Sequence, residues 1–268
     1  TMITHINNNV LNMLLGHYFS PRDTGNYNQA HQWNTKCFSL VQNMVAQVAQ
    51  PILVDLNPSA DRQMNAFRKM MRFTAFISFP LLLGFGLVAR EFIVLAITEK
   101  WLASADLIQF LCVSGAVVPL STLMSNMVVS KGRSDMFFWS TFALGAPLIA
   151  VMLLIWPLGI HIMVVAYVCI QVAWLFVWQM LVRRLTGYGV WMFLRDTVPF
   201  ALAAYAVMAL VHVVTLGIES LWILLLSRIV LATVLYYIVM KVARVRILDE
   251  CTDFILSRIL KKHSSDGQ

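Results

Sequence analysis

Seven polar side chains recur along residues 26–56 at a spacing that places them on one face of a helix. They are separated by steps of three or four residues, as Gln29, Gln32, Lys36, Ser39, Asn43, Gln47 and Gln50. Amide and ammonium groups lose their water in lipid, so such a face is rarely turned toward a bilayer. The stripe predicts a helix that lines a water-filled cavity or packs against other helices.

The remaining side chains of this stretch fit a membrane span. Its opposite face carries Ala30, Trp33, Cys37, Leu40, Met44 and Val48. From Gln29 to Gln50 a helix rises roughly 32 Å at about 1.5 Å per residue, close to the thickness of a bilayer's hydrocarbon core. The alternative is a helix that lies flat on the membrane surface, but such helices usually carry several charges, and Lys36 is the one charge between Gln29 and Gln50.

Further polar candidates lie nearby. Residues 1–19 read as a span, and His5, Asn8, Asn12 and Gly16 share one of its faces. Asn8 and Asn12 therefore join Gln29, Gln32, Lys36, Asn43, Gln47 and Gln50 as candidates for a substrate path. His31 is a candidate that could exchange protons near neutral pH or act as a hydrogen-bonding lining residue.

Arg228 is the deepest charge in the last predicted span, residues 220–240. A charged residue within a span costs on the order of 2.5–3.5 kcal/mol on insertion scales, which makes it a default candidate for function. Its guanidinium could attract an anionic substrate such as a phosphate. It could instead extend to the outer headgroups or pair with a carboxylate elsewhere.

The composition indicates a membrane protein. The chain has 268 residues, of which 59% are hydrophobic and 12% charged. Soluble domains contain about 25% charged residues, so this chain has too little polar surface for a globule in water. The net charge is +7. The basic residues that produce it lie between apolar runs, so the charge does not indicate nucleic-acid binding. The four cysteines are scattered without metal-ligand spacing, and we expect no metal and no cofactor.

Six further apolar segments complete an all-α, polytopic transmembrane bundle of about eight spans. They lie at about 73–89, 107–129, 136–158, 160–182, 197–218 and 220–240. Residues 247–268 are expected to form an amphipathic tail on the membrane surface. The chain starts inside a predicted helix and therefore reads as the later part of a longer protein.

The basic residues predict the orientation. Of the 20 lysines and arginines, fifteen lie in the connections at 57–72, 130–135 and 183–196 and in the tail after 240. The alternate connections hold three, Arg22, Arg90 and Lys100. This bias places the C-terminus in the cytoplasm.

The sequence shows no catalytic constellation, and we expect the protein not to be an enzyme. It has no GxSxG, no P-loop, no HExxH and no paired acids at a membrane face. The carboxylates that precede the tail, among them Glu91 and Asp196, all fall near predicted span ends. If transport is driven by protons or sodium, the coupling acid is expected outside this chain.

Three segments resemble bacterial polysaccharide flippases. They are LLGHYFSPRDTGNYNQAHQW at 14–33, the stretch at 66–112 with RKMMR, FISFPLLLG and EKW, and PLSTLMSNMVVSKGRSD at 119–135. The order and spacing of these segments resemble those of proteins in the polysaccharide transport branch of the multidrug/oligosaccharidyl-lipid/polysaccharide exporter superfamily. Beyond residue 136 the resemblance consists mainly of the helix pattern.

The resemblance implies a fourteen-span fold around a central cavity, in which this chain supplies spans 7 to 14. By the same resemblance, residues 1–182 would form the second six-helix bundle, with a truncated first span, and residues 183–246 would add two spans. The implied activity is the movement of a polyprenyl-pyrophosphate-linked oligosaccharide across the bacterial inner membrane, for O-antigen, lipopolysaccharide or exopolysaccharide export. Amide side chains suit a sugar, and Lys36 suits a pyrophosphate. Membrane lipids and the polysaccharide polymerase or export machinery are the implied partners.

Three other functions remain open. A multidrug or organic-cation antiporter of the same superfamily would favour carboxylates and aromatic residues in its cavity. A membrane enzyme of glycan assembly would show a large external loop or clustered histidines and acids. A structural scaffold would leave the polar stripe without a role.

Overall fold

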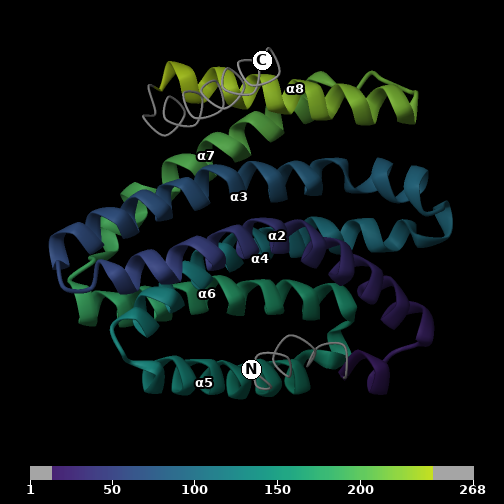
Figure 1. Cartoon of the computed structure of the whole chain (residues 1–268). Coiled ribbons are helices and arrows are strands. Elements are labelled where there is room, and N and C mark those ends of the chain that lie inside the picture. The colour runs from purple at the N-terminus through teal and green to yellow at the C-terminus, as the bar shows by residue number, and fades with distance from the viewer. Residues whose placement is uncertain (1–13, 244–268) are drawn as a thin grey trace, which may run out of the picture.

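The computed structural model describes residues 14–243, and its regular structure within that range is helical throughout (Figure 1). The seven long helices are α2 (Pro21–Asp55), α3 (Ala60–Ala96), α4 (Leu102–Ser130), α5 (Ser134–Ile155), α6 (Ile160–Thr186), α7 (Val190–Val214) and α8 (Leu221–Val242). Single 3₁₀ turns, Glu99–Trp101 and Trp156–Leu158, precede α4 and follow α5. All seven helices are long and apolar enough to cross a membrane. The predicted all-α, polytopic class is confirmed.

Two predicted segments lie mainly outside the described residues. Of the first predicted span, residues 14–18 are described and helical. Candidates Asn8 and Asn12 and the amphipathic tail at 247–268 lie outside the described range. The division of the chain at residue 182 stays a prediction.

Residues 20–25 cap and begin α2. The Ser20 hydroxyl accepts a hydrogen bond from the Asp23 amide at 3.2 Å, and Pro21 occupies the first helical turn. Serine is a preferred N-cap residue, and proline fits the first turn because its missing N–H needs no partner there. These residues therefore favour a helix start at Pro21.

The helix α3 is longer than the predicted span of 73–89 and includes much of the predicted connection at 57–72. It begins at Ala60 and ends at Ala96, so Arg68, Arg72 and Glu91 all belong to it. Arginine and glutamate have good helix propensity, so charge alone does not end a helix. Hydropathy locates the apolar middle of α3 and misses its polar ends.

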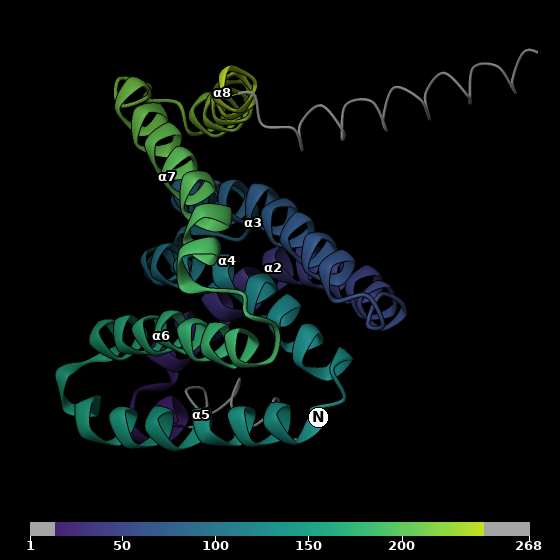
Figure 2. The same cartoon turned by 90° about the vertical axis from the view of Figure 1, so that its left-hand side faces the viewer.

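The helix α4 is the centre of the bundle. It packs against α2, α3, α5 and α6 (Figure 1). Within its most apolar 18-residue window 67% of the residues are buried, compared with 33% or less in the other six helices. Small residues such as Ser114, Gly115 and Ala116 allow neighbouring helices to approach closely. The helix α5, by contrast, lies at the edge and contacts mainly α6 (Figure 2).

The last two helices lie on the opposite side of the bundle from α5 (Figure 2). Gly187, in a left-handed conformation (φ 76°), ends α6. The helix α7 then crosses α3, and α8 packs against both α3 and α7. A tyrosine on α8, Tyr236, donates a hydrogen bond to the carbonyl of Phe76 at 3.0 Å. Pro80 leaves this carbonyl without its helical donor, so α8 satisfies a group that the proline frees.

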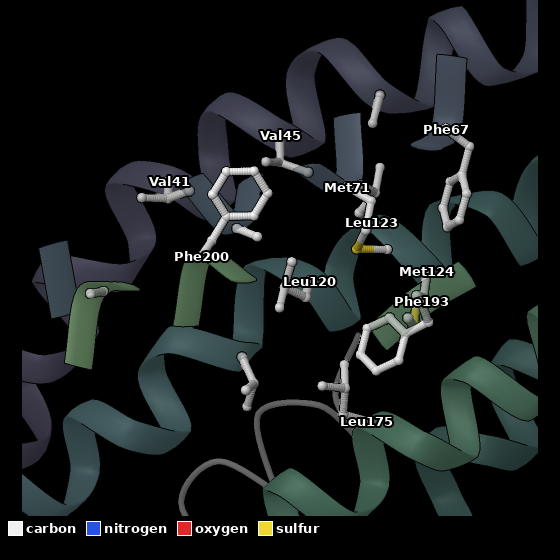
Figure 3. Packing of buried hydrophobic residues seen from close by; sticks show 14 of the residues in the cluster. Val41, Val45, Phe67, Met71, Leu120, Leu123, Met124, Leu175, Phe193 and Phe200 are labelled. Atoms are coloured by element: carbon white, nitrogen blue, oxygen red, sulfur yellow. The ribbon is translucent and has the colours of Figure 1, made fainter. Parts of the chain in front are cut away.

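The buried apolar residues form two separate cores. The first core lies toward the end where α2 meets α3 and includes Val41, Val45, Phe67, Met71, Leu123 and Leu175 (Figure 3). The second core lies toward the end where α3 meets α4 and includes Tyr27, Ala30, Ile93, Ile108, Met163 and Val164. On α4 the second core ends at Ala116 and the first begins at Val117.

Candidate functional site

A polar cavity lies between α2, α4, α5 and α6, at the level where the two cores meet. Its volume is about 390 Å³. The lining residues with hydrogen-bonding side chains are His31, Asn34, Thr35, Gln42, Ser114, Ser121, Thr122, Ser125, Thr141, Tyr167, Gln171, Trp174 and Trp178. The described lining holds no aspartate, glutamate, lysine or arginine. Ordinary apolar packing between spans does not need so many polar groups. The lining therefore indicates that the cavity holds water or a polar ligand.

Close contact between α2 and α4 forms one wall of the cavity. Asn34 on α2 is 3% exposed and lies against Gly115 on α4, where an added Cβ would collide with Asn34 Oδ1. This oxygen is buried and has no hydrogen-bond partner among the described residues. A buried amide oxygen without a hydrogen-bond partner costs about 1–3 kcal/mol, so Asn34 Oδ1 lowers the stability of this conformation.

The α4 hydroxyls are held by their own helix. Ser114 donates to the Leu111 carbonyl at 2.8 Å, and Ser125 donates to the Thr122 carbonyl at 2.8 Å. Across the cavity wall, Gln42 on α2 donates to the Thr122 hydroxyl at 3.0 Å. Because these hydroxyl protons are used, the oxygens that remain are hydrogen-bond acceptors.

Helices α5 and α6 supply an aromatic wall. The rings of Phe137 and Trp178 are 5.9 Å apart at an interplanar angle of 36°. Gln171 donates to the Tyr167 hydroxyl at 3.0 Å, whereas the indole N–H of Trp174 is buried without a partner in the described part. Aromatic faces together with hydrogen-bonding groups suit a ligand that has both apolar and polar surfaces.

The predicted stripe on α2 and the cavity occupy different faces of the helix. Exposed residues of the stripe are Gln32, Lys36, Asn43, Gln47 and Gln50, and Gln29 is half-buried. Lys36 Nζ lies 4.1 Å from the centroid of the Trp33 ring, a cation–π contact. Of the predicted candidates on α2, only His31 lines the cavity. The role of the others in a substrate path stays a prediction.

Sequence reasoning missed most of the cavity. The sequence did not identify Asn34, Thr35 and Gln42 as lining residues. The helix α2 carries polar residues on more than one face, and the longest polar stripe is on another face. The signal that could have found them is the steps of three, four and four that join His31, Asn34, Phe38 and Gln42. A second signal is the run of hydroxyl residues at 121, 122 and 125 in an apolar span.

Arg228 pairs with a carboxylate, one of the alternatives that the sequence left open. Its Nη1 lies 2.8 Å from Glu91 Oε1 and 3.1 Å from the Leu87 carbonyl. Its Nε donates to the Thr215 hydroxyl at 3.1 Å, and Nη2 lies 3.2 Å from His212 Nδ1. This cluster joins α3, α7 and α8, and it does not contribute to the polar cavity.

Two carboxylates assigned to span ends are buried within helices. Glu91 on α3 is 4% exposed, and Asp196 on α7 is 1% exposed. Asp196 accepts two hydrogen bonds from Arg68, at 2.8 and 3.1 Å, and one from the Tyr188 hydroxyl at 3.1 Å. Both residues lie near a helix end, as the sequence predicts, and their side chains are buried because their partners come from distant helices.

The helices and the sequence comparisons together define a multi-pass membrane protein. Residues 1–106 match the family described as "Polysaccharide biosynthesis protein". The chain is similar to the teichuronic acid biosynthesis protein TuaB of Bacillus subtilis, with 28% identity over 141 residues, 52% of this chain and 29% of TuaB. It is also similar to the lipopolysaccharide biosynthesis protein WzxC of Escherichia coli, with 24% identity over 138 residues, 52% of this chain and 28% of WzxC.

A third relative is a membrane protein encoded in the cps region of Klebsiella pneumoniae, with 23% identity over 136 residues, 51% of this chain and 28% of the relative. The chain therefore spans less than a third of the length of these relatives. No solved structure matches it. The predicted resemblance to a family of polysaccharide membrane proteins is confirmed.

Proposed function

We propose that the protein is a flippase that moves a lipid-pyrophosphate-linked oligosaccharide across the bacterial cytoplasmic membrane for polysaccharide export. The observation that carries this proposal is the uncharged polar cavity between membrane-spanning helices. The similarity to TuaB and WzxC supports a glycan as the cargo. In this proposal the chain transports and does no chemistry, and its C-terminus lies in the cytoplasm.

The exposed face of α2 supplies a second polar surface for the cargo. Gln32, Asn43 and Gln47 offer hydrogen bonds to sugar hydroxyls, and Lys36 offers a positive charge to the pyrophosphate. The contact with Trp33 holds the ammonium group on the helix surface. We expect the polymerase and export proteins that use the translocated glycan to be the partners.

Deletion and complementation in the host bacterium test this proposal. Deletion of the gene is expected to abolish outer-leaflet glycan and to raise lipid-linked oligosaccharide on the inner leaflet, and the full-length gene should restore both. Lys36→Ala and a Gln32/Asn43/Gln47→Leu triple variant should restore less, at matched membrane levels. Normal outer-leaflet glycan in the deletion strain would refute the proposal. Drug sensitivity without a glycan defect would instead favour the antiporter.

A further inference from the structure

The polar cavity differs from the exposed face of α2 in having no charged residue in its described lining. We infer that it binds one uncharged sugar unit of the cargo and that it discriminates against a sugar that bears a carboxylate. The inference rests on the proposed function and adds to it the chemical class of the unit that this subsite accepts. Any acidic unit of the same glycan would lie elsewhere along the path.

Part of the hydrogen-bond donor capacity of the cavity wall is already used within the protein. The hydroxyl protons of Ser114 and Ser125 are used by backbone carbonyls of α4. The amide nitrogen of Gln171 already donates to Tyr167. Hydroxyl groups of a neutral sugar can donate to the remaining oxygens, but a carboxylate can only accept. A uronic acid would therefore enter without a lysine or arginine of the described lining to pair with its carboxylate.

Burial makes this discrimination strong. A charge that is taken out of water without a partner carries a large desolvation penalty, and the cavity lies between the middle parts of four apolar helices. A neutral sugar avoids this penalty, because each of its hydroxyls needs only one or two hydrogen bonds. The cavity therefore selects by the absence of charge as much as by the contacts it offers.

Unpaired polar atoms on the cavity wall point to a ligand. Asn34 Oδ1, Thr35 Oγ1 and Trp174 Nε1 are buried and have no hydrogen-bond partner among the described residues. Asn34 is itself 3% exposed, so bulk water does not satisfy it. Asn34 Oδ1 faces Gly115, whereas the Thr35 hydroxyl and the Trp174 indole N–H are the groups that we expect a sugar hydroxyl to pair with, because it both donates and accepts.

The size and the aromatic residues agree with a single ring. Pockets for small molecules have volumes of about 300–1,000 Å³, and this cavity of about 390 Å³ is at the small end. The apolar C–H face of a sugar ring can lie on an indole, and Trp174 and Trp178 offer two. The cavity thus suits a single sugar ring and is too small for a whole oligosaccharide.

Translocation assays with two one-sugar substrates test the inference. The full-length protein is reconstituted in liposomes with lipid-pyrophosphate-linked glucose or lipid-pyrophosphate-linked glucuronic acid, which differ only in the carboxylate. We expect the glucose lipid to be moved at least tenfold faster. Gln171→Lys, which adds a cation to the cavity, should reduce or reverse this preference. Gln109→Lys, the same change at an exposed site on α4 outside the cavity lining, should leave the preference unchanged.

The outcomes separate this inference from the proposed function. Equal rates for the two lipids with the unaltered protein would overturn the neutral-sugar subsite and leave the flippase function standing. A preference for glucose that Gln171→Lys does not alter would also overturn it. Failure to move either lipid, in a preparation shown to be folded, would refute the flippase proposal and the subsite with it.

Discussion

Arg228 on α8 and Glu91 on α3 form a buried ion pair, with 2.8 Å between Nη1 and Oε1 and side chains that are 8% and 6% exposed. The two residues are 137 positions apart in the chain. Thr215 at the end of α7 hydrogen-bonds to the same guanidinium. The pair, together with Thr215, therefore connects α7 and α8 to α3.

Breaking this pair from one side is expected to destabilise the protein strongly. Arg228→Ala leaves Glu91 buried without its cation, and losing one partner of a buried pair costs about 3–5 kcal/mol. The double variant Arg228→Ala/Glu91→Ala should be less destabilised than Arg228→Ala alone. Thermal unfolding in detergent measures this, with Arg133→Ala in the exposed Arg133–Asp135 pair as the control, for which we expect no clear change. A double variant less stable than Arg228→Ala would contradict the pairing.

Asp196 is expected to stabilise the start of α7. Asp196→Asn removes the negative charge that accepts two hydrogen bonds from Arg68. Hydrogen bonds to charged groups contribute about 1.5–3 kcal/mol, and the loss should lower the unfolding temperature. The change Asp135→Asn in the exposed pair is the matched control. Equal unfolding temperatures for the two variants would show that Asp196 has no special role.

The close approach of α2 and α4 depends on Gly115. Gly115→Ala forces the new methyl group against Asn34, and overpacking of this kind costs about 1–3 kcal/mol. Gly84→Ala on α3 is the control, because its methyl group would meet only the flexible end of Met208 at 3.3 Å. Unfolding measurements should show a loss at position 115 and little change at position 84.

A second change identifies the cause. Asn34→Ala combined with Gly115→Ala should recover most of the lost stability, because the colliding amide is gone. If the double variant stays as unstable as Gly115→Ala, the contact with Asn34 is not responsible.

The contribution of Tyr188 should depend on alkaline pH. Burial, followed by the charge of Asp196, raises the pKa of Tyr188 above its ordinary value. A raised pKa in the folded state means that the contribution is complete below the ordinary tyrosine pKa of about 10 and declines as the pH rises above it. The stability difference between the unaltered protein and Tyr188→Phe should therefore be constant near neutral pH and shrink above about pH 10. A difference that is independent of pH would contradict this assignment.

The sequence predicted the spans well because each one contains a long apolar window. It misplaced the ends of α3, because Arg68, Arg72 and Glu91 are compatible with a helix but invisible to hydropathy. Glu91 and Asp196 do lie near helix ends, as predicted, but their burial was not predicted. Their partners Arg228 and Arg68 come from other helices, and no local pattern reveals a pairing across more than a hundred residues.

The candidate site was predicted only in part. The polar character of α2 was recognised, but the face that borders the cavity was not. Which face is buried depends on where α4 and α6 pack, and the buried stripe of α2 runs through Tyr27, Ala30, Asn34, Val41 and Val45. A helix with polar residues on several faces does not by itself indicate which one meets its neighbours.

The division of the apolar interior into two cores has a mechanical consequence. On α3, Pro80 lies between Ala75 of the first core and Leu82 of the second core. On α4, Pro119 lies just beyond the boundary between the cores. Prolines weaken the helical hydrogen bonding at this level. Bending of α3 and α4 is therefore easiest where the two cores meet, and it would change the shape of the polar cavity that lies at this level.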